Sequence, residues 1–371
     1  MKPHRSTLGL VAATGALALT LAACGSDSPT ATPSADAEPG SADAGDTSLS
    51  GSLVGAGASS QESAMQAWIA GFQAANPDVT VSYDPVGSGG GRTQFTEGAT
   101  DFGGTDAALD EEEWAAAEAR CAPGAPLEVP LYISPIAVAF NLPGIDSLNM
   151  SPATIAGIFN GDVTSWDDAA IAESNPDVDL PALAITPVNR SDESGTTENF
   201  TEYLVAAAGD AWPHEASGDW PRSGTQSAQG TSGVVQTVQS AEGAITYADA
   251  SKVGGLGTVA VQVGDEFVPY SPEAAAAVVD ASPLAEGRAG TSLVRELERD
   301  TTASGVYPIV LVSYTMACTA YGDAEEAALV KAFLTYVASE EGQQAASSAA
   351  GSAPISGDMR STVMELVDSI S

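Results

Sequence analysis

Along most of the chain, short apolar runs typical of strands alternate with segments whose apolar residues have the spacing of a helix. Short apolar runs such as 79–87 end in glycine-containing turns, and segments with helical spacing follow them. In residues 61–75, for example, Met65, Trp68 and Phe72 are spaced so that they would lie on one face of a helix. Strand, turn and helix repeated in this order predict an α/β architecture.

The same criteria predict further elements as far as residue 346. The predicted strands lie in 52–60, 79–87, 100–109, 127–143, 183–190, 243–249 and 307–317. The predicted helices lie in 61–75, 88–95, 110–119, 151–161, 196–209 and 323–346. Residues 88–95 are expected to begin as a glycine turn, and 323–346 to form one long helix. Asp110 and Glu113 have the spacing of a capping box.

The first 49 residues have a different composition. Residues 1–23 carry two basic residues ahead of an apolar run, which is the pattern of a secretory signal. The run ends in Leu-Ala-Ala followed by Cys24, so we interpret it as a lipobox in which cleavage leaves Cys24 lipidated; a plain signal with an unrelated cysteine is the alternative. Residues 24–49 would then be the lipidated cysteine and a flexible tether. The lipid would anchor the exported protein to the outer face of a bacterial cell membrane.

The charge balance narrows the classes of partner and of chemistry. The 371 residues include 12 Lys and Arg against 49 Asp and Glu, a formal net charge of −37. Such a surface repels nucleic acid, so no nucleic-acid partner is expected, and any bound anion must be captured by local geometry. The histidines are His4 and His214, which is too few for a histidine-rich zinc site and gives little basis for a Ser–His–Asp triad. We therefore expect no metal, no cofactor and no catalytic residue.

Two cysteines remain beyond the lipobox. Exported chains meet oxidising conditions, so Cys121 and Cys318 are expected to form a disulfide. Two buried free thiols are the alternative.

Three segments share one design, in which a strand ends, small hydroxyl-bearing residues follow, and a helix begins. They are 55–60 (GAGASS), 87–91 (GSGGG) and 194–196 (SGT). Helix N-termini present unpaired N–H groups and a partial positive charge, and glycine lets the backbone approach a ligand closely. One such segment alone is more often a simple helix cap. Three of them, with Arg190 beside the third, predict an oxyanion site.

Together these segments resemble the phosphate-binding component of bacterial phosphate ABC importers. The resemblance covers most of the chain from about residue 51, and its motifs keep the family's order and spacing. They are GAGAS (55–59), GSGGG (87–91), DFGGTDAAL (101–109), AGIFNGDVTSWDDAAIAESNP (156–176), PVNRSDESGT (187–196) and GAITYAD (243–249). The resemblance implies a two-domain periplasmic binding protein fold of type II, with a ligand cleft between the domains and two extended crossover segments.

The resemblance also implies which residues bind phosphate. They are Ser59, Ser60, Ser88, Asp106, Arg190, Ser194, Gly195 and Thr196. Two positions depart from the family, which often has Thr-Phe where this chain has Ser59-Ser60, and Gly where it has Glu193. The first departure removes an aromatic cover, although binding survives if Ser60 contributes its backbone N–H. The second adds an acid that must point to solvent or find a cation, since affinity would otherwise fall.

Asp106 is an unusual residue for an anion site because like charges repel. Protonated phosphate species can donate a hydrogen bond to a carboxylate, whereas fully ionised sulfate cannot. A group that only accepts hydrogen bonds would therefore reject sulfate. The alternative is a turn aspartate that caps the following helix. Asp192, two residues from Arg190, is expected to orient the guanidinium group.

These observations predict an extracytoplasmic protein that captures inorganic phosphate. It would deliver phosphate to the membrane permease and ATPase subunits of an ABC importer, and it is expected to be a monomer. The predicted domains are 50–140 plus 302–371 and 141–301, joined near 137–143 and 307–313. An extracytoplasmic phosphatase or phosphoryl-transfer enzyme, or a surface lipoprotein with a vestigial site, is the alternative.

Overall fold

The computed structural model describes residues 49–371 of the chain. The predicted signal peptide, the predicted lipidation site Cys24 and nearly all of the predicted tether lie outside these described residues. Within 49–371, no helix is both long enough and apolar enough to cross a membrane.

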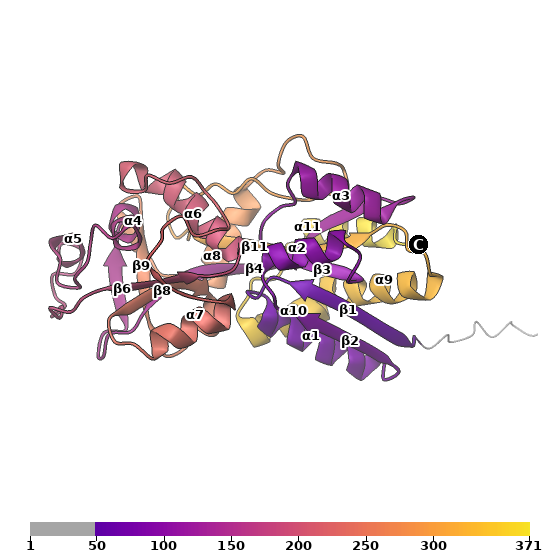
Figure 1. Ribbon diagram of the computed structural model, residues 1–371, viewed down its shortest axis with the longest axis horizontal. Coiled ribbons are helices and arrows are strands. Elements are labelled where there is room, and N and C mark those ends of the chain that lie inside the picture. The colour runs from indigo at the N-terminus through magenta and orange to yellow at the C-terminus, as the bar shows by residue number, and fades with distance from the viewer. Residues whose placement is uncertain (1–48) are drawn as a thin grey trace, which may run out of the picture. The chain divides into compact units, whose positions relative to one another are not determined.

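Eleven strands of the described residues form one mixed sheet (Figure 1). In chain order they are β1 Gly51–Gly57, β2 Val79–Asp84, β3 Phe102–Thr105, β4 Pro126–Phe140, β5 Ser147–Met150, β6 Thr186–Arg190, β7 Gln226–Ala228, β8 Ala244–Asp249, β9 Gly257–Val263, β10 Glu266–Val268 and β11 Val310–Cys318. Their order across the sheet is β2-β1-β3-β11-β4-β8-β6-β7, and β9 pairs with β4, β5 and β10. The strands that the sequence predicts are all present.

The long strand β4 changes its partner along its length. Residues 126–135 pair antiparallel with β11, and residues 136–140 pair antiparallel with β8. All 15 positions of β4 are buried, which explains why its sequence is nearly continuously apolar and does not alternate. We call β2, β1, β3 and β11 the β1 side and β8, β6 and β7 the β8 side. Because β4 is hydrogen-bonded to both, it connects them through continuous backbone.

Helices pack against the β1 side and against the β8 side. In chain order the helices, including two short 3₁₀ turns, are α1 Glu62–Ala75, α2 Ser88–Thr96, α3 Glu111–Cys121, α4 Pro152–Asn160, α5 Ala169–Ala172, α6 Gly195–Ala207, η1 Gly209–Ala211, α7 Gly230–Gln239, η2 Ala250–Lys252, α8 Pro272–Ala281, α9 Ala324–Ala338, α10 Glu340–Ala350 and α11 Gly357–Asp368. On the β1 side, α1 contacts β2, and α2 contacts β1 and β3. On the β8 side, α6 contacts β8, and α7 contacts β6 and β8.

Local sequence explains the start of α3 and the buried face of α1. Asp110 and Glu113 form a capping box at the start of α3, each accepting a hydrogen bond from the other's backbone N–H, which confirms the predicted cap. Met65, Trp68 and Phe72 are buried along α1, as their helical spacing predicts. The cap of α3 therefore closes within one helical turn, whereas along α1 the spacing decides which residues are buried.

Two predicted elements were wrong in detail. Residues 323–346 form parts of two helices, because the chain is extended at Ser339 and the Ser339 hydroxyl accepts a hydrogen bond from the Gly342 N–H to start α10. A Cβ at Gly342 would lie 2.1 Å from the Tyr336 carbonyl oxygen, so this close restart requires glycine. Residues 88–91 are already helical, because the positive φ that needs glycine occurs one residue earlier, at Gly87 (104°).

Cys121 and Cys318 form a disulfide, as the sequence predicts. The bond joins the end of α3 to the end of β11 across a sequence separation of 197. It lies in a buried cluster with Phe95, Leu109 and Met316. The disulfide therefore holds α3 against the antiparallel pair that runs through the middle of the sheet.

Candidate anion-binding site

The N-termini of four helices meet where the β1 side and the β8 side face each other. Ser59, just before α1, accepts a hydrogen bond of 3.0 Å at Oγ from the backbone N–H of Thr231 in the first turn of α7. Gly195 begins α6 and packs against Ser88, which begins α2: a Cβ on Gly195 would lie 2.7 Å from Ser88 Oγ. The partial positive charges of α1, α2, α6 and α7 therefore converge on one region.

The Asp106 carboxylate connects the two sides within this region. Asp106 is 3% exposed, and its carboxylate accepts hydrogen bonds from Ser60 Oγ (2.7 Å), Thr196 Oγ1 (3.0 Å) and Ser313 Oγ. The Asp106 N–H donates to Ser88 Oγ at 3.1 Å. Thr196 lies on the β8 side and the other three residues on the β1 side, so the carboxylate holds elements of both.

The protonation of Asp106 reflects two opposing effects. Burial raises the pKa of the Asp106 carboxyl above its ordinary value, whereas the hydroxyl donors and the Arg190 charge lower it. The hydroxyl groups favour the ionised form because they donate to it. A carboxylate has about four acceptor sites, so three hydroxyl donors leave room for one more donor.

Arg190 supplies the positive charge of the site. It ends β6, is 3% exposed, and donates from Nε to Asp192 Oδ1 at 2.8 Å and from Nη2 to Asp192 Oδ2. Asp192 Oδ1 also accepts from the Gly230 N–H at 3.1 Å. Asp192 therefore connects the guanidinium group to the start of α7.

Aromatic residues fix the turn between β6 and α6. The Tyr247 hydroxyl accepts a hydrogen bond from the Arg190 N–H at 3.4 Å and shares one of 2.8 Å with Thr197 Oγ1. The Tyr247 ring stacks on Phe200 with centroids 4.3 Å apart. Ser194 caps α6 by accepting from the Thr197 N–H at 3.2 Å. This buried support holds the predicted segment 194–196 in place.

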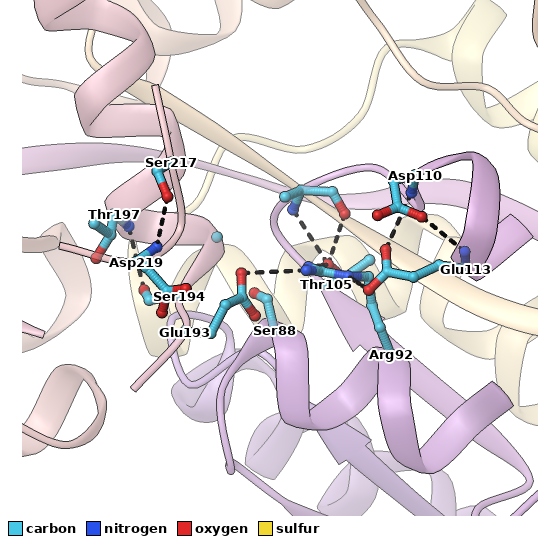
Figure 2. Close-up of polar contacts among 12 residues, drawn as sticks. Ser88, Arg92, Thr105, Asp110, Glu113, Glu193, Ser194, Thr197, Ser217 and Asp219 are labelled. Atoms are coloured by element: carbon cyan, nitrogen blue, oxygen red, sulfur yellow. Dashed lines mark hydrogen bonds and ion pairs between the residues drawn. The ribbon is translucent and has the colours of Figure 1, made fainter. Parts of the chain in front are cut away.

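Glu193 forms an ion pair with Arg92 of α2 (Figure 2). The distance between Arg92 Nη2 and Glu193 Oε1 is 3.2 Å, and Arg92 Nε lies 2.8 Å from Glu113 Oε1. Glu193 therefore meets the expectation that it must face solvent or find a cation. Arg92 belongs to the β1 side, whereas Glu193 belongs to the β8 side.

The structure brings all eight predicted site residues into this one buried region. All eight are buried, with exposed fractions of 5% for Ser59, 0% for Ser60, 1% for Ser88, 3% for Asp106, 3% for Arg190, 1% for Ser194 and 2% for Thr196, and Gly195 is buried too. Sequence reasoning missed the fourth helix start, although residues 229–233 (QGTSG) follow β7 with the same design as the other three. It also missed Ser313, which lies within a strand and carries no local signal.

The residues present can bind an anion through N–H groups, hydroxyls and one guanidinium. Within residues 49–371, no group of three or more His, Cys, Asp and Glu residues could hold a metal ion. His214 hydrogen-bonds to Asn160 Oδ1 at 3.1 Å, so its ring is engaged with a residue that is not a nucleophile. The geometry gathers fixed donors around one region, as an anion-binding site requires.

Comparison with known proteins identifies the family. The profile of the PBP superfamily domain matches residues 41–341. The chain is 37% identical over 343 residues to the phosphate-binding protein PstS 3 of Mycobacterium leprae, a match that covers 89% of each protein. It is 35% identical over 335 residues to the phosphate-binding protein PstS 3 of Mycobacterium tuberculosis, covering 87% of this chain and 89% of that protein. The chain therefore belongs to the PBP superfamily and, within it, to the family of these PstS proteins.

Solved structures share the fold. The high-affinity periplasmic phosphate-binding protein PfluDING, bound with phosphate, superposes with a TM-score of 0.68 at 21% identity, covering 84% of this chain and 93% of that one. A phosphate-binding protein from Stenotrophomonas maltophilia gives a TM-score of 0.63 at 19% identity, covering 85% and 93%. These likenesses confirm the predicted α/β fold of the two-domain periplasmic binding proteins.

Proposed function

We propose that this protein captures inorganic phosphate in the cleft between its two domains and delivers it to an ABC importer. The observation that carries the proposal is the buried acceptor Asp106 placed among donors, with the Arg190 guanidinium and four helix N-termini nearby. Near neutral pH phosphate keeps at least one proton, so it can donate to Asp106 while its other oxygens accept hydrogen bonds. Membership of a family whose relatives are named phosphate-binding proteins supports the same ligand.

The proposed ligands are spread over both domains. We assign Ser59, Ser60, Ser88 and Asp106 to the domain formed by 50–140 plus 302–371, and Arg190, Ser194, Gly195 and Thr196 to the domain formed by 141–301. The Asp192 bonds use Nε and one N–H of Nη2, which leaves three guanidinium N–H groups for an oxyanion. The backbone N–H groups in the first turn of α7, which contains Thr231, are additional candidate donors to the phosphate.

The net charge of −37 is compatible with anion binding. Charge-assisted hydrogen bonds contribute about 1.5–3 kcal/mol each, and micromolar affinity needs only about −8 kcal/mol in total. Charges farther away than about 8 Å are largely screened at physiological ionic strength. Local donors therefore decide the outcome.

The export signal, the anchor on Cys24 and the tether 24–49 complete the proposal. They would hold a monomer near the permease and ATPase subunits on the outer face of the cell membrane. Membrane partitioning of the wild-type protein and of Cys24→Ser tests the anchor. The variant should lose membrane association, and equal partitioning of both would contradict lipidation.

Titration calorimetry tests the ligand. Phosphate should bind with a saturable heat signal, whereas sulfate at tenfold higher concentration should give none. No binding of phosphate, or equal binding of both anions, would contradict the proposal. Release of phosphate from a generic monoester, with and without divalent metal, separates binding from catalysis: the proposed function expects no turnover.

A further inference from the structure

Arg92 and Glu193 support an inference that rests on the proposed function and goes beyond it. Arg92 lies on α2, on the β1 side, and Glu193 lies in the loop between β6 and α6, on the β8 side. The 3.2 Å contact between Nη2 and Oε1 thus joins the two sides at the loop that carries Arg190 and Ser194. We propose that this ion pair is a clasp that holds the two sides of the cleft together and sets the affinity and release rate of phosphate.

Contacts with Glu113 and Thr105 orient Arg92 independently of Glu193. Its side chain is 9% exposed; Nε lies 2.8 Å from Glu113 Oε1 and Nη1 donates to Thr105 Oγ1 at 3.1 Å. Glu113 is itself held by the capping box with Asp110. The guanidinium has therefore already lost most of its rotamer freedom, so its bond to Glu193 costs less entropy than a bond between two free surface side chains.

The clasp is linked to the turn that carries Asp106. Thr105 Oγ1, which accepts from Arg92, also donates to the Ala107 carbonyl oxygen at 2.6 Å and accepts from the Ala107 N–H at 3.2 Å. Asp106 lies between these two residues. Arg92 therefore supports both the acceptor for the proposed ligand and the loop of the opposite side.

The Glu193 carboxylate occupies a space that both sides leave for it. A Cβ at Gly89 of α2 would lie 1.6 Å from Glu193 Oε2, and a Cβ at Gly218 would lie 2.2 Å from Glu193 Oε1. Any larger residue at either position would displace the carboxylate. The side chain of Glu193 is 30% exposed, so solvent screens this pair less than it screens a surface pair.

The competing interpretation is that Glu193 repels the bound anion. The two interpretations predict opposite signs for Glu193→Gln, because loss of a clasp weakens phosphate binding whereas loss of repulsion strengthens it. Arg92 offsets part of the Glu193 charge, although it shares its own charge with Glu113, and this direct contact with a cation favours the clasp. The pKa of Arg92 agrees: burial lowers it, but the carboxylates of Glu193 and Glu113 raise it by more.

Calorimetry and stopped-flow release of phosphate test the clasp in E193Q, R92Q and the double variant. Each single variant should bind about 5–10 times more weakly, mainly through faster release, and the double variant should be no worse than R92Q alone. Glu340→Gln is the control, since it removes a pair with Arg360 (2.8 Å) between α10 and α11, and it should leave affinity unchanged. Affinity that is equal or higher in E193Q overturns the proposal.

Gly218→Ala provides an independent arm. It should weaken phosphate binding in the wild-type background, because its Cβ displaces the Glu193 carboxylate, and have no further effect in Glu193→Gly. Circular dichroism confirms that both backgrounds are folded. Equal losses in the two backgrounds would show that Gly218 acts in another way and would contradict the clasp.

A ligand-free measurement separates this proposal from the proposed function. Spin labels at the exposed positions Gln66 of α1 and Gln236 of α7 report the distance between the two sides. The clasp predicts a narrow distance distribution in the wild type and a broader one in E193Q, even for a protein that fails to bind phosphate. Identical distributions overturn it.

Discussion

Thr196 Oγ1 donates a hydrogen bond of 3.0 Å to the Asp106 carboxylate, although 90 positions separate the two residues. Ser60 reaches the same carboxylate from 46 positions away and Ser313 from 207. Three distant segments therefore share one acceptor. The Asp106 carboxylate faces donors from the β1 side and from the β8 side. Its charge should therefore affect both the choice of ligand and the closure of the cleft.

Asp106→Asn should weaken phosphate binding and reduce the rejection of sulfate. Asparagine keeps the size of the side chain but adds an NH₂ donor that can face a fully ionised anion. Loss of one charge-assisted hydrogen bond, about 1.5–3 kcal/mol, corresponds to about 10- to 150-fold weaker phosphate binding. Calorimetry with each anion measures both effects, with the exposed Asp265→Asn as control. Unchanged discrimination would show that another group rejects sulfate.

Gly195→Ala should weaken phosphate binding by about tenfold, because overpacking of this kind costs about 1–3 kcal/mol. The added Cβ would lie 2.7 Å from both Asp106 Cβ and Ser88 Oγ, so the two sides would have to separate. Gly254→Ala is the matched control, since nothing lies within 4 Å of a Cβ there. Equal affinities of the two variants would contradict the close approach of α6 and α2.

Glu198 should make stability depend on pH. Burial and then the Glu202 carboxylate raise the pKa of Glu198 to about 7, Arg92 opposes them, and Glu193 and Glu113 add to the rise. The folded state therefore holds this proton more tightly than the unfolded state does. The stabilisation is fully present below about pH 4.5 and is lost as pH rises through about 7.

Urea unfolding of Glu198→Gln measures this effect. At about pH 8 the variant should be more stable than the wild type by about 1 kcal/mol, a value reduced for the partial exposure of the side chain. At about pH 5 the difference should be much smaller, because the wild-type carboxyl is then mostly neutral. A difference that does not change between the two pH values would contradict the raised pKa.

Reduction of the disulfide between Cys121 and Cys318 should destabilise the protein by about 3–5 kcal/mol, because the bond closes a long loop in the unfolded chain. Denaturant unfolding with and without reductant measures the loss. The double variant C121S/C318S should match the reduced wild type and should not respond to reductant. An unchanged midpoint on reduction would show that the disulfide contributes little.

Sequence patterns were sufficient where the cause of an element lies within a few residues. The capping box of Asp110 and Glu113 is one case, because both bonds close within one helical turn. The division of 323–346 into α9 and α10 was missed although the Ser339 cap that starts α10 is local; the restart at Gly342 is also held by a hydrogen bond of 2.8 Å from Trp68 Nε1 to the Gly342 carbonyl oxygen. Trp68 lies 274 positions away from Gly342.

The sequence by itself determined the α/β class and the starts of three helices that face the site, because period, propensity and capping act over short distances along the chain. The eight candidate ligands came from the resemblance of its motifs to a known family. Only the tertiary structure decided that Ser313 donates to Asp106 and that Glu193 meets Arg92 over separations of 207 and 101 positions. The order of strands across the sheet determines which distant residues come into contact. The family often has Gly at the position of Glu193. The ion pair with Arg92, which comes from the opposite side of the cleft, explains how this chain accommodates the carboxylate.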